Sequence, residues 1–188
     1  MMARVLEHRT SSVAAPARVD LVQLLSEAYA GPAWHGPSLR SVLRGVTPSE
    51  AIWRPAPGRN TIWELLLHVA YSRHRVLGRL ARYVPAPHAP DRPPSFPHKM
   101  RREWWPAVPD AAMSPGPPSE GAWRDDIALL NEQHERLTAA VRAVPARYLD
   151  TRRPSTPHTL AQEVAGIALH DTYHSGQIRL IQLLCAAR

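Results

Sequence analysis

The sequence contains a single cysteine, Cys185, in 188 residues, which excludes an intramolecular disulfide framework. Apolar runs of about 18 residues, the length that a membrane-spanning helix needs, are also missing. The N-terminal segment mixes charges with small residues and has no apolar block of the kind that forms the core of a signal peptide. We therefore expect a soluble protein in the cytoplasm that does not enter a membrane.

Lysine is nearly absent, since Lys99 is the only one, and arginine supplies the other basic residues of a chain with a formal net charge of +7. A basic chain raises the hypothesis of nucleic-acid binding. The arginines are dispersed, however, and the densest spots are only the pairs Arg101-Arg102 and Arg152-Arg153. The sequence also has no aromatic-basic motif of the kind found in RNA-binding domains. We therefore do not expect a nucleic-acid partner.

Alternation of apolar and polar residues, the pattern of a half-buried strand, is missing as well. Apolar residues recur instead at helical spacing. Capping boxes, in which a Thr and a Glu or Gln three residues later satisfy each other's backbone N–H groups, mark helix starts at Thr47, Thr61 and Thr159. The expected long helices cover residues 20–30, 61–83, 123–144 and 159–184, and the expected short helices begin near residues 37 and 48.

These helices predict an all-α fold, a four-helix bundle without strands. An apolar content of 44% with six tryptophans supports a single hydrophobic core. We expect one domain over residues 19–188, preceded by a flexible N-terminal segment, residues 1–18. More than half of the 20 prolines lie in residues 84–118, between the second and third long helices. Because proline suits neither a helix interior nor a central strand, we expect a long irregular connection that packs over the domain as a lid.

Two histidines, His170 and His174, stand four residues apart in the last helix, so their imidazoles lie on one face, a turn apart. Gln177 points in nearly the same direction. The pair alone is a weak signal, because two polar residues at the margin of a helix have the same spacing. His68, in the middle of the second long helix, is the best third ligand, although a core-edge histidine bonded to a carbonyl would look the same. Three imidazoles from two helices would form an open metal site of the catalytic type.

Other candidates have competing explanations. His134 occupies an inward seam position, where it is a ligand, a partner of a ligand or a core residue, and His35 lies at a helix break from which it could line the same cavity. Glu64 is accounted for by its capping box. Glu163 lies two turns from His170, about 10 Å along the axis, which is too far to bind the same ion. Cys185, at the expected end of the last helix, has no base partner in the sequence.

Four motifs, in this order, resemble the DinB-like superfamily, which includes the YfiT-like proteins. They are WHGPSL (34–39), WRPAPG (53–58), IWELLLH (62–68) and HDTYHSGQI (170–178). The resemblance implies a metal-binding four-helix bundle in up-down-down-up order and a homodimer. It also implies that His68, His170 and His174 bind a divalent metal ion, commonly nickel, zinc, iron or manganese. Several members of the family are transferases or isomerases that use bacillithiol, mycothiol or glutathione, and others are regarded as hydrolases.

The resulting hypothesis is a metal-dependent enzyme that activates a low-molecular-weight thiol cosubstrate as its thiolate and transfers it to a small-molecule substrate. Arg75, with arginines of the lid, would hold carboxylates of the cosubstrate, and Gln177 would orient a ligating imidazole or a metal-bound water. Two alternatives stay open at this point. The metal would activate water in a hydrolase, or the protein would be a non-catalytic, stress-related binder of a metal or small ligand.

Overall fold

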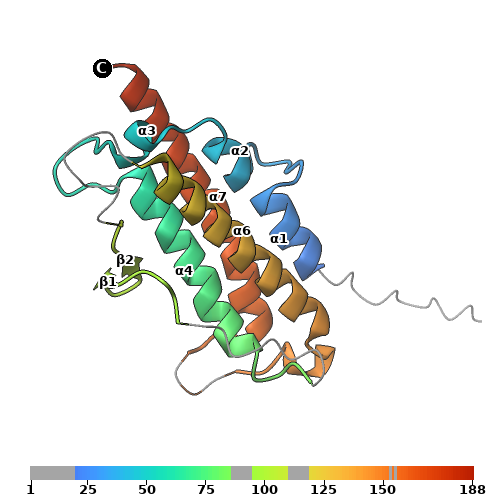
Figure 1. Ribbon diagram of the computed structural model, residues 1–188. Coiled ribbons are helices and arrows are strands. Elements are labelled where there is room, and N and C mark those ends of the chain that lie inside the picture. The colour runs from blue at the N-terminus through green and yellow to red at the C-terminus, as the bar shows by residue number, and fades with distance from the viewer. Residues whose placement is uncertain (1–19, 86–94, 110–118, 153, 155) are drawn as a thin grey trace, which may run out of the picture.

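The structure is a computed structural model that describes residues 20–85, 95–109, 119–152, 154 and 156–188. The N-terminal segment that we expect to be flexible, residues 1–18, lies outside the described residues. Four helices form the bundle (Figure 1): α1 (Leu21–Tyr29), α4 (Ile62–Leu80), α6 (Glu120–Ala143) and α7 (Leu160–Ala186). The other helices among the described residues are α2 (Leu39–Leu43), α3 (Pro48–Ile52) and the 3₁₀ turn η1 (Ala146–Tyr148).

The helix starts follow from the capping residues. Thr47, Thr61 and Thr159 each accept a hydrogen bond from the backbone N–H three residues later, and the Glu or Gln at that position reaches back to the N–H of the threonine. Each box satisfies two backbone N–H groups that the first helical turn leaves without partners. All three predicted capping boxes are therefore confirmed, and the expected helix ends are correct to within about three residues.

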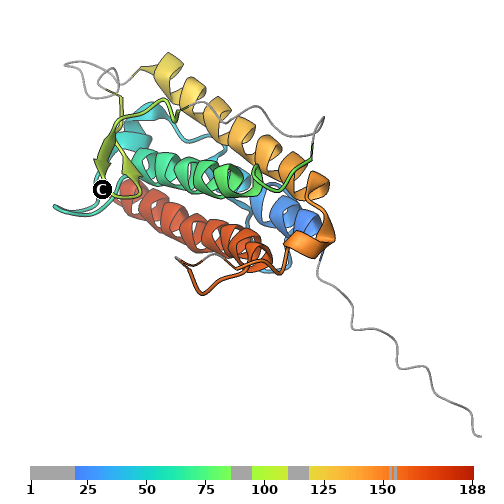
Figure 2. The same cartoon turned by 90° about the horizontal axis from the view of Figure 1, so that it is seen from below.

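Helices α4 and α6 run in the same direction, opposite to α1 and α7, so the order is up-down-down-up (Figure 1). The chain returns from the end of α4 to the start of α6 through the Pro-rich connection, which makes this arrangement possible. Seen from below, the four long helices enclose one interior (Figure 2). The all-α four-helix bundle is thus confirmed. None of the described helices is long and apolar enough to cross a membrane.

The expectation of a chain without strands is wrong. Within the Pro-rich connection, β1 (Met100–Arg102) and β2 (Trp105–Pro106) pair as an antiparallel hairpin. Strands of three and two residues are too short to show an alternation of apolar and polar side chains, so the sequence pattern does not indicate them. The described part of the connection, residues 95–109, packs on α4, as expected for a lid. Residues 86–94 and 110–118 lie outside the described residues.

The interior consists of two apolar clusters, one toward each end of the bundle. Between them, at mid-length of α4 and α7, lies a charged pair: Arg73 donates to Asp171, and both side chains are fully buried. Buried charges are tolerated only when paired in this way. The histidines of interest lie close to this pair along the two helices: His68 is about one turn before Arg73, His170 directly precedes Asp171, and His174 follows Asp171 by about one turn.

Candidate metal centre

Three histidine side chains from two helices meet beside this charged pair. The Nε2 atom of His170 lies 3.0 Å from Nε2 of His68 and 3.0 Å from Nε2 of His174. In tetrahedral coordination at ordinary metal–nitrogen distances, ligand nitrogens lie about 3.3 Å apart. His68 is 9% exposed and His174 is 4% exposed, so the cluster is largely shielded from solvent. Together the three residues could hold a metal ion.

His68 and His174 are the two outer rings of the cluster, on either side of His170. Their other hydrogen bonds determine which ring nitrogen carries the proton. His68 Nδ1 is 2.7 Å from the carbonyl oxygen of Trp104, and His174 Nδ1 is 2.6 Å from Oε1 of Gln177. A carbonyl oxygen only accepts, so each Nδ1 must carry the hydrogen. In the neutral rings both Nε2 atoms then present a lone pair toward His170. His170 Nε2 can donate a hydrogen bond to only one of these two lone pairs, whereas a cation between the rings would stabilise both. Three imidazole nitrogens are a ligand set that fits a divalent ion.

All three rings are held neutral. Burial lowers the pKa of His170 to about 3, with further contributions from His174, His68 and Arg73. Burial lowers the pKa of His174 to about 4, against the opposing effect of its hydrogen bond to Gln177. The pKa of His68 is also lowered, mainly by burial. Neutral imidazole is the form that binds metal, so the site is in its binding form at neutral pH.

The hairpin completes the surroundings of His68. The Trp105 ring stacks on the imidazole at 4.1 Å between centroids, with the planes 6° apart. Trp104, in the turn between the strands, has φ of +65°, a left-handed conformation that is rare for a bulky residue and costs about 1–2 kcal/mol. Its carbonyl is the group that accepts from His68. The hairpin therefore fixes the orientation of one histidine while covering its ring.

The other residues singled out in the sequence lie in different places. Gln177 contacts His174, since its Oε1 lies 2.6 Å from Nδ1 of that ring. His134 stacks on Tyr29, with 3.9 Å between the ring centroids, and is not part of the cluster. His35 is exposed, 3.4 Å from the hydroxyl of Thr172. Arg75 lies over the ring of Trp104, 4.9 Å from its centroid, rather than among the histidines.

The acidic candidates and the cysteine have structural explanations. Glu64 caps α4 and pairs with Arg54 and Arg101, which hold its pKa below the usual range although burial alone would raise it. Glu163 pairs with Arg79. Cys185 is buried in the last turn of α7.

Sequence reasoning missed the roles of Trp104 and Trp105. The only available signal is the pair itself, two adjacent tryptophans inside a Pro-rich connection, because a solvated linker has no need of such rings. The turn conformation decides which tryptophan ring covers His68. It also decides that a backbone carbonyl accepts the hydrogen bond of His68.

Comparison with known proteins identifies a family for this arrangement. A family model described as the DinB superfamily matches residues 34–178, which include all three histidines, Gln177 and the hairpin. Comparisons with curated proteins and with solved structures give no match.

Proposed function

The chain belongs to the DinB superfamily, and on this premise we propose that it binds a divalent metal ion through Nε2 of His68, His170 and His174. The observation that carries the proposal is the convergence of the three Nε2 atoms, with the Nδ1 atoms of the two outer rings already bonded to acceptors. Nickel, zinc, iron and manganese are all candidates, since imidazole suits most late first-row ions.

We further propose an enzyme that uses a low-molecular-weight thiol as cosubstrate, in an S-transfer reaction. The chain's only thiol, that of Cys185, is buried and outside the histidine cluster, so a thiol would have to arrive with a small molecule. A divalent ion held by the histidines would supply Lewis acidity, which favours the ionised form of a coordinated thiol or water.

The residues of the chain have separate tasks in this proposal. The Trp104 carbonyl and the Gln177 amide oxygen fix two Nδ1 protons and so keep the Nε2 lone pairs available. Trp105 lies flat on His68 and excludes water from that face of the ring. The charge of Arg73 contributes to keeping His170 neutral. These contacts position and protect the ligands, while the substrate has to approach from another side.

Elemental analysis of the purified full chain tests the metal. We expect about one divalent ion per chain, as for a specific site, and none in the His170→Ala/His174→Ala double variant. His158→Ala, at an exposed loop position, is the matched control and should keep the ion. A folded wild-type chain that takes up none of the four candidate ions on titration would show that the site does not bind metal.

Thiol transfer is tested with monochlorobimane, an electrophile that becomes fluorescent on conjugation. The metal-loaded chain is incubated with bacillithiol, mycothiol or glutathione. We expect one thiol to react faster than without protein, and the acceleration to disappear in the histidine double variant. If none is accelerated although the metal is bound, the transferase proposal is wrong, and hydrolase or binding roles would then be examined.

We also propose a homodimer formed through α7. Exposed residues recur along this helix at alternating spacings of four and three: Leu169, Tyr173, Gly176, Leu180 and Leu183. The four large side chains are 53–68% exposed. This is the seam pattern of paired helices, and Gly176 would allow close approach of a second copy. In sedimentation velocity, Leu169→Arg/Leu183→Arg should convert dimer to monomer. A wild-type monomer at micromolar concentration would contradict the proposal.

A further inference from the structure

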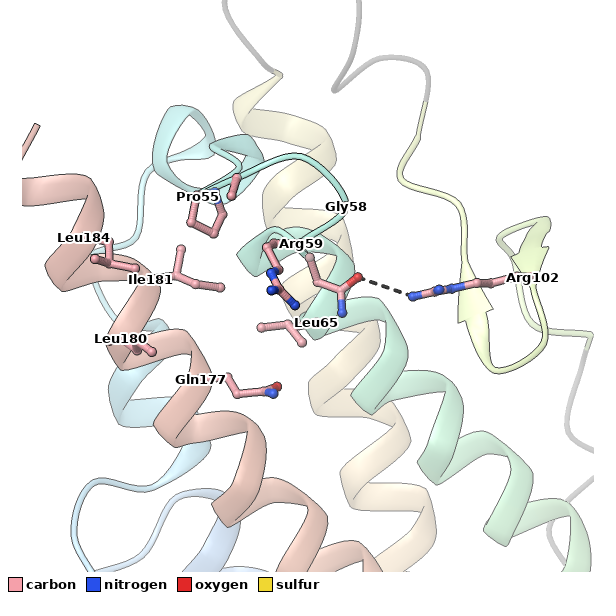
Figure 3. A pocket seen from close by; sticks show the side chains of 11 residues that line it. Pro55, Gly58, Arg59, Leu65, Arg102, Gln177, Leu180, Ile181 and Leu184 are labelled. Atoms are coloured by element: carbon pink, nitrogen blue, oxygen red, sulfur yellow. Dashed lines mark hydrogen bonds between the residues drawn. The ribbon is translucent and has the colours of Figure 1, made fainter.

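A pocket of about 460 Å³ lies between the C-terminal half of α7, the start of α4, the loop before α4 and the hairpin (Figure 3). The loop contributes Arg59 and Asn60, the hairpin contributes Arg102, and α7 contributes Gln177 at one end. Figure 3 shows Arg59, Arg102 and Gln177 approaching the same space from three directions. The pocket is therefore built by segments that are distant in the sequence.

The charge of the pocket has one sign. Two arginines line it, and no described lining residue is acidic. The neighbouring arginines Arg54 and Arg101 both form ion pairs with Glu64. Within the described part of the chain, by contrast, Arg59 and Arg102 form no ion pair, and the hydrogen bond of Arg102 to Asn60 Oδ1 is long, at 3.5 Å. Two guanidinium groups that lack a carboxylate partner are suited to an anionic ligand.

The opposite wall is apolar. It consists of leucine and isoleucine side chains from α4 and α7: Leu65, Leu180, Ile181 and Leu184. A concave site with an apolar wall and a few placed polar groups is the usual form of a small-molecule site. A ligand that satisfies both sides has an anionic group attached to an apolar portion.

Two residues connect the pocket to the histidine cluster. Gln177 lines the pocket and holds Nδ1 of His174 through its Oε1. Arg102 lies over the Trp105 ring at 4.8 Å, and that ring stacks on His68. A molecule in the pocket therefore contacts residues that touch two of the three histidines, one from each helix.

We propose that this pocket binds the carboxylate of the small-molecule substrate together with an adjoining apolar portion. Arg59 and Arg102 pair with the carboxylate, and the α7 side chains pack against the apolar portion. The inference rests on the proposed function, because it takes the histidine cluster as the centre that the bound molecule serves. The sequence suggests Arg75 and arginines of the lid for carboxylate recognition; the proposal keeps a lid arginine, Arg102, and replaces Arg75 with Arg59 of the loop before α4.

The probe is 4-phenylbutyrate, compared with its uncharged analogue 4-phenylbutanamide. Calorimetry on the full chain in EDTA prevents the carboxylate from binding a metal ion. We expect the acid to bind about tenfold more tightly than the amide, as for a charge-assisted pair. Arg59→Gln and Arg102→Gln should each weaken the acid about tenfold and leave the amide unchanged. Arg124→Gln, at an exposed position of α6 outside the pocket, is the matched control.

Several outcomes would overturn the proposal. They are equal affinity of acid and amide, equal weakening by the control variant, and no saturable binding of the acid below about 10 mM. Arg102→Gln also removes a contact with Trp105, so Arg59→Gln, in an exposed loop, decides the result if the first variant folds poorly.

A second measurement tests whether the pocket adjoins the centre. With Mn²⁺ bound, the proton signals of 4-phenylbutyrate should broaden, and Arg59→Gln should reduce the broadening. A chain that holds both Mn²⁺ and the acid without broadening contradicts the role of the pocket. A chain that takes up no metal contradicts the proposed function, while the result in EDTA still decides the carboxylate preference.

Discussion

Gln177 connects the histidine cluster to its surroundings through both ends of its amide. The oxygen accepts from His174 Nδ1, and the nitrogen donates to the hydroxyl of Tyr173 at 3.0 Å. Groups that orient a ligating imidazole contribute about 10–100-fold to metal affinity. We therefore expect Gln177→Ala to weaken metal binding by that factor, measured by competition with a chromogenic chelator.

The control for Gln177 is Gln23→Ala. Gln23 also bonds a neighbour on its own helix, Glu27, but on the exposed face of α1. The Gln23→Ala variant should leave metal affinity unchanged. Equal affinities for the Gln177 variant and the wild type would mean that His174 is held by the helix alone.

His134 differs from the clustered histidines although it too is partly buried and neutral. Its ring stacks on Tyr29, its Nδ1 is buried without a hydrogen-bond partner, and burial lowers its pKa to about 4. Because His134→Phe keeps the stacking and removes the unsatisfied nitrogen, we expect a gain of about 1 kcal/mol in the free energy of unfolding. Urea denaturation measures it, and metal content should not change. Loss of metal in this variant would assign His134 to the site.

At this scale the sequence predicts the clustered histidines better than the groups that hold them in place. The spacing of His170 and His174 requires only that the segment be helical, and His68 follows from a capped helix with a clear apolar face. The carbonyl of Trp104 cannot be predicted in the same way. It reaches His68 only because the turn adopts φ of +65°, a conformation that a tryptophan does not signal.

At the scale of elements, the helices could be predicted because each start has its own local chemistry. A threonine with a Glu or Gln three residues later gives the same cap in three unrelated positions. The hairpin lacks such a signal, since its few backbone hydrogen bonds depend on packing against α4. The pocket depends on how three distant segments meet, so only the folded chain defines it.

Glu64 joins three elements, because it caps α4 and pairs with Arg54 of the preceding loop and Arg101 of the hairpin. Glu64→Gln retains an amide oxygen for the cap and removes the negative charge. We expect a loss of about 1–2 kcal/mol in unfolding free energy, because the side chain is nearly buried while both arginines are partly exposed.

Hydrogen exchange gives the second readout for Glu64. In Glu64→Gln the hairpin amides should exchange faster, while α7 should be unaffected at equal global stability. Unchanged exchange in the hairpin would mean that Trp105, stacked on His68, holds it without the ion pair.

At the scale of the molecule, the bundle holds neutral histidines at its centre, so its stability should depend on pH. The pKa of His170 is lowered to about 3, and burial lowers those of His174 and His134 to about 4. Unfolded histidine has a pKa of about 6.5, so below this pH the unfolded chain binds more protons than the folded chain. Asp171 acts in the opposite sense over its own range, because burial raises its pKa.

For the histidines the stabilising contribution is complete above pH 6.5 and is lost as the pH falls from there toward about 4. Each contributes a slope of at most about 1.4 kcal/mol per pH unit. Urea denaturation of the metal-free chain between pH 7.5 and about 4.5 should show that the unfolding free energy falls as the pH falls, and that it falls less steeply in His134→Phe.

A saturating divalent ion should add stability at pH 7.5 and lose this effect on acidification, since protons compete for the same Nε2 atoms. Unfolding free energies of the metal-free chain that stay constant between pH 7.5 and about 4.5 would mean that the histidines take up protons as readily in the folded chain as in the unfolded chain, which would contradict the lowered pKa values.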